Sequence, residues 1–177
     1  MKKAKSIAAF IMAVIFATGL CACGGDAEES SQAGDGGAKT ETVYKVGDTW
    51  EVEGQWKFTV DNVTVTDERN EFEESDPAQV IIVEYHYENI GYKDESGLMS
   101  GLFLDVGMAQ QIDAEGNMCS EYPLGSIEAM PQETPVGAKC TAQTAIGLKA
   151  AGGPVKIMIE QYDSNSDLQS ATFELEF

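Results

Sequence analysis

From residue 42 onward, short runs of alternating apolar and polar residues recur, and residues that favour turns separate them. The run TWEVE at 49–53 places Trp50 and Val52 on one face and two glutamates on the other. Such alternation is typical of strands with one buried face, and no stretch of ten residues here keeps the spacing of an amphipathic helix. This region is therefore expected to fold from strands.

The spacing of these runs predicts an all-β fold of seven to eight strands, an antiparallel sandwich or barrel, and the sandwich is favoured because one strand is expected to be buried on both faces. Residues 123–138 are rich in Pro and Gly and are expected to form a crossover loop. The expected strands are 49–53, 54–67, 78–89, 102–111, 118–122, 139–148, 155–163 and 171–177.

Two of these runs depart from simple alternation. In residues 54–67, the apolar pattern slips by one residue at Asp61 and Asn62, which predicts a β-bulge or a bend from one sheet to the other. The continuous apolar run from Val80 to Val83 predicts a strand that is buried on both faces.

The N-terminal segment has the order of a secretory signal. Three lysines within the first five residues precede the uncharged segment 7–20, which is shorter than the roughly 20 residues of a membrane-spanning helix. Residues 1–22 are therefore predicted to be a signal peptide. Its end resembles a bacterial lipobox, in which an aliphatic residue and two small residues precede a lipidated cysteine.

Two registers of this lipobox are possible, with Cys21 or Cys23 as the lipid acceptor. Leu20, Cys21 and Ala22 before Cys23 fit the pattern better than the residues before Cys21, because those put leucine where a small residue belongs. We therefore expect a diacylglyceryl group on Cys23, which would hold the protein at the outer face of the cytoplasmic membrane. Residues 23–42 contain no aromatic residue and are expected to be a flexible tether to a domain at 43–177.

The chain has a formal net charge of −19, and without residues 1–22 it keeps 8 basic and 30 acidic residues, a charge of −22. Such a surface repels nucleic acid and anionic lipid headgroups, so contact with the membrane is expected through the anchor alone. Plausible partners are cations, basic proteins or neutral polymers.

Candidate functional residues within the domain have two interpretations each. Cys119 and Cys140 flank the crossover loop and could form a disulfide that closes it, or remain separate buried thiols. The acidic segment 67–76 could bind calcium, although its spacing is not that of an EF-hand, or it could be a solvated loop.

The sequence contains no recognisable nucleophile motif to act with His86, which is expected to be an ordinary strand residue. Five aromatic residues could form a sugar-binding platform or the core: Trp50, Trp56, Tyr85, Tyr87 and Tyr92.

Four segments resemble Ig-like domains of Gram-positive lipoproteins, often called the DUF4352 or telokin-like group and related to mycobacterial immunoprotective secreted antigens. The opening YKVGDTWEVEG and the strand IIVEYHYENIG, which ends near an Asn-Gly turn, are two of them. The others are the hairpin QQIDAEGNMCSEY, with Asp113 and Gly116 in its turn, and TPVGAKCTAQTAIGL. The resemblance runs from about Tyr44 to the end. It implies an Ig-like antiparallel β-sandwich at the cell surface and supplies no catalytic residue, metal or cofactor.

These observations favour a non-enzymatic, membrane-anchored binding module that holds a protein, peptide or glycan at the cell envelope. The alternatives are a lipoprotein that captures a substrate or cation for a transporter and, less favoured, a surface hydrolase. A hydrolase would need a convergent set of polar residues that the sequence does not display.

Overall fold

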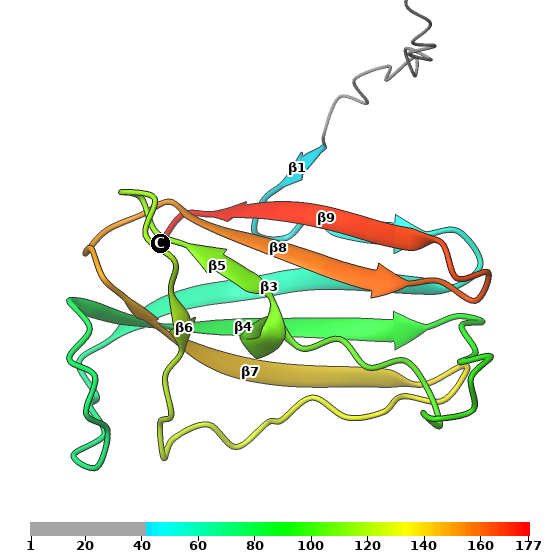
Figure 1. Ribbon diagram of the computed structural model, residues 1–177, viewed down its shortest axis with the longest axis horizontal. Helices are drawn as coiled ribbons and strands as arrows, with labels where there is room; N and C mark the ends of the chain where they lie inside the picture. Colours follow the sequence, from blue (N-terminus) through cyan, green and yellow to red (C-terminus); the bar gives the residue numbers. More distant parts are fainter. Residues whose placement is uncertain (1–41) are drawn as a thin grey trace, which may run out of the picture. The chain divides into compact units, whose positions relative to one another are not determined.

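Two β-sheets pack face to face in the part of the protein that the computed structural model describes, residues 42–177 (Figure 1). One sheet has the strand order β1-β9-β8-β5, and the other has the order β2-β3-β4-β7-β6. The elements are β1 (Val43–Tyr44), β2 (Thr49–Val52), β3 (Trp56–Thr66), β4 (Gln79–Asn89), the 3-10 helix η1 (Val106–Met108), β5 (Gln110–Ile112), β6 (Ser120–Glu121), β7 (Lys139–Leu148), β8 (Val155–Tyr162) and β9 (Leu168–Leu175).

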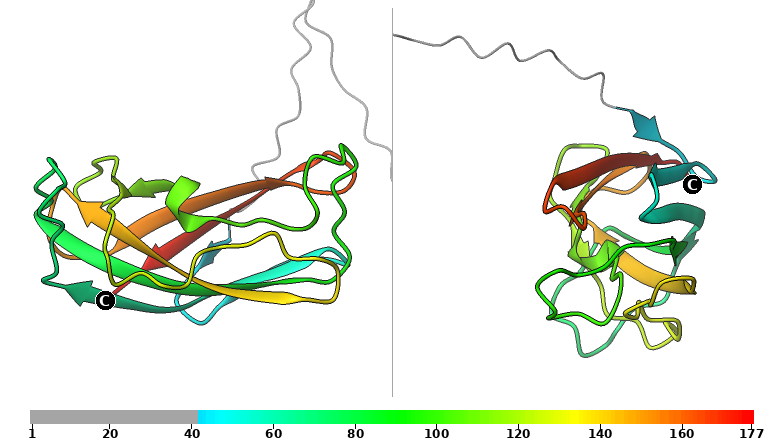
Figure 2. Two further views of the ribbon diagram at one scale, coloured as in Figure 1. Left: turned by 90° about the horizontal axis from the view of Figure 1, so that it is seen from below. Right: turned by 90° about the vertical axis from the view of Figure 1, so that its right-hand side faces the viewer.

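The two layers, seen clearly in Figure 2, confirm the all-β sandwich expected from the sequence. The structure adds β1, which has two residues and is too short for alternation to reveal it, while β6 is the paired part of the strand expected at 118–122. Neighbouring strands are antiparallel except for β1, which runs parallel to β9. Within residues 42–177, no helix has the length and apolar character that a membrane crossing requires.

The core between the sheets is rich in aromatic rings. Trp56 is fully buried, and its ring lies edge-on to those of Trp50 and Tyr92, with centroids 5.6 Å and 5.7 Å away. Phe58 joins the two sheets through an edge contact with Phe173 at 5.3 Å. None of the five aromatic residues considered as a sugar platform is more than 6% exposed, so they belong to the core.

The slip in the apolar pattern of β3 is a β-bulge. Val60 pairs with Tyr85 and Asn62 pairs with Glu84, which leaves Asp61 as the extra residue. Asp61 and Asn62 consequently both face outward, and β3 remains in one sheet along its whole length. The predicted bulge is confirmed, and the alternative, a bend from one sheet to the other, is wrong.

The apolar start of β4 is buried on both faces, as its sequence predicts. Ile81 and Val83 face the main core, while Val80 lies in a second cluster on the outer face of the same sheet. Tyr122 and Leu124, from the chain that connects β6 to β7, cover Val80 in this cluster. The expected crossover loop therefore acts as a partial third layer.

The strand expected at residues 102–111 is wrong for most of its length. Leu102 makes one isolated bridge to Thr134, η1 follows at Val106–Met108, and only Gln110–Ile112 pair with β8. The alternation arises because Leu102, Leu104 and Val106 are buried in the core. Apolar side chains that close the side of a sandwich can alternate without forming a hydrogen-bonded ladder.

Two tight turns are organised around buried carboxylates. Asp113 accepts hydrogen bonds from the backbone N–H groups of Asn117 and Ala150, both at 2.8 Å, and Asp163 accepts one from Asp167 at 3.0 Å. Burial opposes ionisation of Asp113, but the hydrogen bonds from Asn117 and Ala150 outweigh it and hold its pKa below the ordinary value. The ionised carboxylate therefore stabilises the fold.

Replacing Asp113 with asparagine should lower the melting temperature by about 5 °C at pH 7 and by less at pH 2.5. Because the folded-state pKa is depressed, the stabilisation is present above the unfolded-state value of about 3.9 and is lost as pH falls through the folded-state value. Thermal melts followed by circular dichroism test this, with Asp67→Asn in an exposed loop as the control. A difference that is the same at both pH values would contradict the expectation.

Candidate functional site

Several residues singled out in the sequence lie outside the part that the structure describes. These are the predicted signal peptide 1–22, the predicted lipid acceptor Cys23 and the tether as far as residue 41. The predictions about the anchor consequently rest on sequence alone.

Cys119 and Cys140 are free thiols that lie far apart. Ser120 pairs with Gly147 on β7, and Cys140 lies seven residues before Gly147 on that strand. At about 3.3 Å per residue the separation along β7 is roughly 23 Å. A disulfide needs Cα atoms within about 7 Å, so the bridge is not formed and the alternative of separate thiols stands.

Each thiol instead contributes to packing beside the core. Cys140 pairs with Tyr87 of β4, whose hydroxyl donates to the carbonyl of Gln132 at 2.6 Å. Burial, together with a hydrogen bond involving Cys140, raises the pKa of Tyr87 to about 12. Tyr87 is thus a neutral hydrogen-bonding residue that fastens the crossover chain to the sheet.

His86 forms a pair with the bulge residue on the outer face of the five-stranded sheet. Its Nδ1 lies 2.7 Å from a carboxylate oxygen of Asp61. Within the described residues, no hydroxyl or thiol group hydrogen-bonds to His86. The pair therefore lacks a nucleophile, and the bulge accounts for it structurally.

The acidic segment 67–76 is a largely exposed loop. Asn70 attaches it to the crossover chain, because its backbone N–H donates to the hydroxyl of Tyr122 at 3.1 Å. No group of three or more His, Cys, Asp or Glu side chains among residues 42–177 is placed to hold a metal ion.

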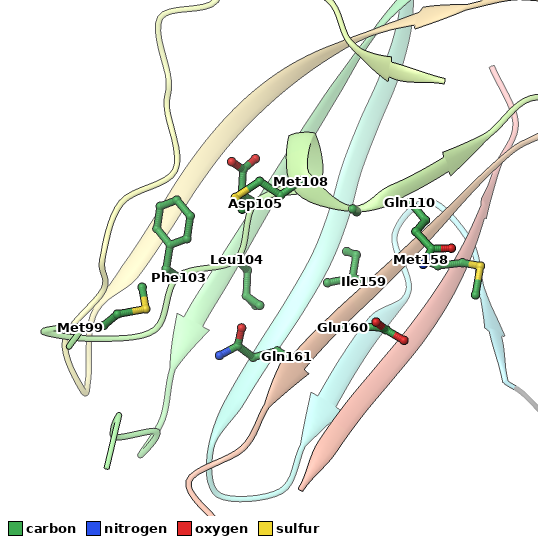
Figure 3. Close-up of a pocket in the computed structure, with 11 residues that line it drawn as sticks. Met99, Phe103, Leu104, Asp105, Met108, Gln110, Met158, Ile159, Glu160 and Gln161 are labelled. Carbon is green, nitrogen blue, oxygen red and sulfur yellow. The ribbon is translucent and has the colours of Figure 1, made fainter. Parts of the chain in front are cut away.

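A concave site lies beside β8 in the four-stranded sheet. It is a pocket of about 350 Å³ between β8 and the chain that leads into η1 (Figure 3). Apolar side chains contribute much of the lining, and carboxylates and amides are placed among them. The lining residues are Met99, Phe103, Leu104, Asp105, Met108, Ala109, Gln110, Met158, Ile159, Glu160 and Gln161.

The pocket exists because β5 ends where β8 continues. Gln110, the first residue of β5, pairs with Met158. Continuing this register would place residues 107–109 opposite 159–161, but the chain leaves the sheet there to form η1. Among residues 42–177, no strand pairs with the β5-side edge of β8 beyond Met158, and the pocket occupies the space beside it.

Two carboxylates hold the far wall of the pocket in place. Asp94 accepts a hydrogen bond from the backbone N–H of Met99 at 2.7 Å, and Glu133 accepts hydrogen bonds from the backbone and hydroxyl of Ser100. Hydrogen bonds from Ser96 and Met99 lower the pKa of Asp94, and those from Ser100 lower the pKa of Glu133.

Gly101, the next residue after Ser100, must be a glycine, because a Cβ at this position would overlap the carbonyl of Thr134.

The charge of the pocket has one sign. Asp105 and Glu160 are its charged lining residues, and no lysine or arginine lines it. A Cβ on Gly107 would lie 3.0 Å from a carboxylate oxygen of Glu121 and 3.1 Å from one of Asp105. The two carboxylates are therefore neighbours. Carboxylates among apolar surfaces suit a ligand that carries both an apolar and a basic group.

Sequence reasoning missed this pocket. Its residues come from a loop, η1 and β8, and none belongs to a recognisable motif. Three methionines line the pocket, Met99, Met108 and Met158, but they are spread along the sequence and form no pattern there. Methionine is favoured at adaptable binding surfaces because its side chain is flexible and polarisable.

Comparisons with known proteins support the fold and nothing finer. The chain is similar to the crystal structure of the yjhA protein from Bacillus subtilis, with 17% sequence identity and a TM-score of 0.55. The likeness covers 76% of this chain and 100% of that one. No protein-family model matches the chain, and no curated protein does either.

Proposed function

We propose that this protein is a lipid-anchored binding module at the outer face of the cytoplasmic membrane, and not an enzyme. Its domain would be of the DUF4352 type that the sequence resembles. The lipobox-like sequence around Cys23 supports the location, and the acidic surface would keep the domain in solution above the membrane.

The observation that carries the binding role is the pocket beside β8. A cavity of about 350 Å³ is within the size range of ligand sites, and its mixture of methionine, phenylalanine and carboxylate side chains provides contact area and orientation. A sheet edge lies along one wall, and sheet edges and loops are common recognition surfaces. The ligand class would be a protein, peptide or glycan of the cell envelope.

Site-specific photocrosslinking in cells tests this proposal. A photoreactive phenylalanine analogue at Phe103, which lines the pocket, should give a discrete adduct with an envelope component. The same analogue at Phe72, which is 88% exposed in the acidic loop, is the control and should give none. Both substitutions replace one aromatic ring with another, so neither should disturb the fold.

The two positions together decide the outcome. An adduct at Phe103 alone would support a binding site at the pocket. Equal adducts at both positions would indicate random collision, and the absence of any adduct at Phe103 would contradict a binding role for this pocket.

A further inference from the structure

We propose that the pocket binds an extended, basic segment of a polypeptide, which adds to the four-stranded sheet as a strand beside β8. This inference rests on the proposed binding function and specifies the chemistry of its ligand. It follows from three features: the vacant register on β8, the apolar lining and the sign of the charge.

The edge of β8 that faces the pocket is unpaired beyond Met158 in the described part of the chain, and it can accept one more strand. β5 pairs with Lys156, Ile157 and Met158, whereas β8 continues to Tyr162. Residues 159–162 remain paired with β9 on their other side, so this part of β8 keeps strand geometry with no second neighbouring strand in the described part of the chain. A strand that enters here would lie in line with β5.

The backbone of β8 can bind such a strand. Alternate residues of a strand direct their N–H and C=O groups toward the same edge, and an edge strand presents these groups unpaired. An incoming extended segment satisfies them through main-chain hydrogen bonds, while pockets for alternate side chains provide specificity. The β8 edge is short, so the side chains must supply much of the specificity.

The pocket supplies two kinds of surface for those side chains. Phe103, Met99 and Met108 lie on the side away from β8, and Met108 is 80% exposed. Asp105 and Glu160 provide negative charge. An extended chain presents alternate side chains to opposite faces, so a segment that alternates apolar and basic residues matches both surfaces.

Charge argues against a second copy of this protein as the occupant. Antiparallel pairing of two β8 edges would bring the exposed Glu160 of each copy close to the other, and each chain carries a formal charge of −19. Like charges brought together across a sheet are destabilising. The complementary occupant is therefore a basic segment of another protein or peptide.

Fluorescence anisotropy with a labelled peptide, Lys-Val-Lys-Val-Lys-Val-Lys, tests this inference on the full chain. We expect a dissociation constant of about 1–100 μM at roughly 0.15 M salt, where long-range attraction is screened. The control peptide Lys-Gly-Lys-Gly-Lys-Gly-Lys carries the same charge without apolar side chains, and should bind about tenfold more weakly. Equal binding of the two peptides would overturn the inference, because attraction by net charge would then suffice.

A matched pair of variants locates the site. Met108→Lys places a positive charge in the pocket and should weaken peptide binding about tenfold. Met130→Lys makes the same change at another methionine, which is 53% exposed and does not line the pocket, and should leave binding within about twofold. Equal effects of the two substitutions would overturn the assignment to this pocket.

Backbone methylation tests for strand addition. Two versions of the peptide, methylated on the valine or on the lysine backbone nitrogens, should differ, because one set faces β8 and the other faces away. Loss of binding by one version alone supports a strand. Equal binding by both versions overturns strand addition. A dimer that forms without peptide and is dissociated by Met108→Lys also overturns the inference, because a second copy would then occupy the β8 edge. If Phe103 gives an envelope adduct but the peptide does not bind, the proposed function stands and this inference falls.

Discussion

Replacement of Cys23 by serine is expected to move the protein from the membrane fraction to the medium almost completely. Two acyl chains hold a protein stably at a membrane, because each buried CH₂ group contributes about 0.8 kcal/mol and one chain alone gives only marginal binding. Without residues 1–22 the chain has a formal charge of −22, so anionic headgroups would repel it. No second attraction would therefore replace the lost anchor.

Cys21→Ser is the matched control, since it changes the same side chain two residues earlier. It should leave the protein in the membrane fraction and labelled by a fatty-acid analogue, because Cys21 would leave with the signal peptide. Cell fractionation and lipid labelling in a Gram-positive host provide the measurement. Release by Cys21→Ser with retention by Cys23→Ser would show that the other lipobox register is used.

Replacement of Trp56 by alanine is expected to lower the free energy of unfolding by about 3–5 kcal/mol. Trp56 is fully buried and pairs with Asn89 on β4, and its ring contacts those of Trp50 and Tyr92. Removing the indole leaves a cavity between these rings and eliminates both edge contacts. This is a large share of the roughly 5–15 kcal/mol that stabilises a typical domain.

Trp56→Phe separates the loss of packing from the loss of the indole itself. The Nε1 group of Trp56 is buried and has no hydrogen-bond partner among residues 42–177, so phenylalanine removes an unpaired donor while it retains a ring. We expect this variant to lose less than about 2 kcal/mol. Urea unfolding followed by the fluorescence of Trp50 gives both values. A loss below about 1 kcal/mol for Trp56→Ala would show that this cluster does not support the core.

The parts of the fold that were predictable are those that local sequence determines. Alternation identified the long strands, and the phase slip at Asp61 identified the bulge, because both follow from a side-chain period of two residues. The turn at 113–117 was equally visible, since its aspartate and glycine have local roles. In each case the signal lies within a few residues of the feature.

The features that escaped prediction depend on pairing between distant segments. Alternation from Leu102 to Val106 indicated burial correctly, but it could not show that these residues close the side of the sandwich without joining a sheet. The separation of Cys119 and Cys140 follows from the register of β6 on β7. The pocket depends on the point at which β5 leaves β8, and no residue pattern marks that point.

The parallel pairing of β1 with β9 has a mechanical consequence if the protein is held by its N-terminus and binds a ligand beside β8. Tension between the membrane and the ligand would then enter the domain through β1. Within residues 42–177, β1 pairs with β9 at Val43 and Tyr44 alone, and the ring of Tyr44 stacks on Phe173 at 5.2 Å. This short contact would yield before the long ladders of β3, β4 and β7. Detachment of β1 would lengthen the connection to the membrane while the rest of the sandwich, and the pocket in it, stayed folded.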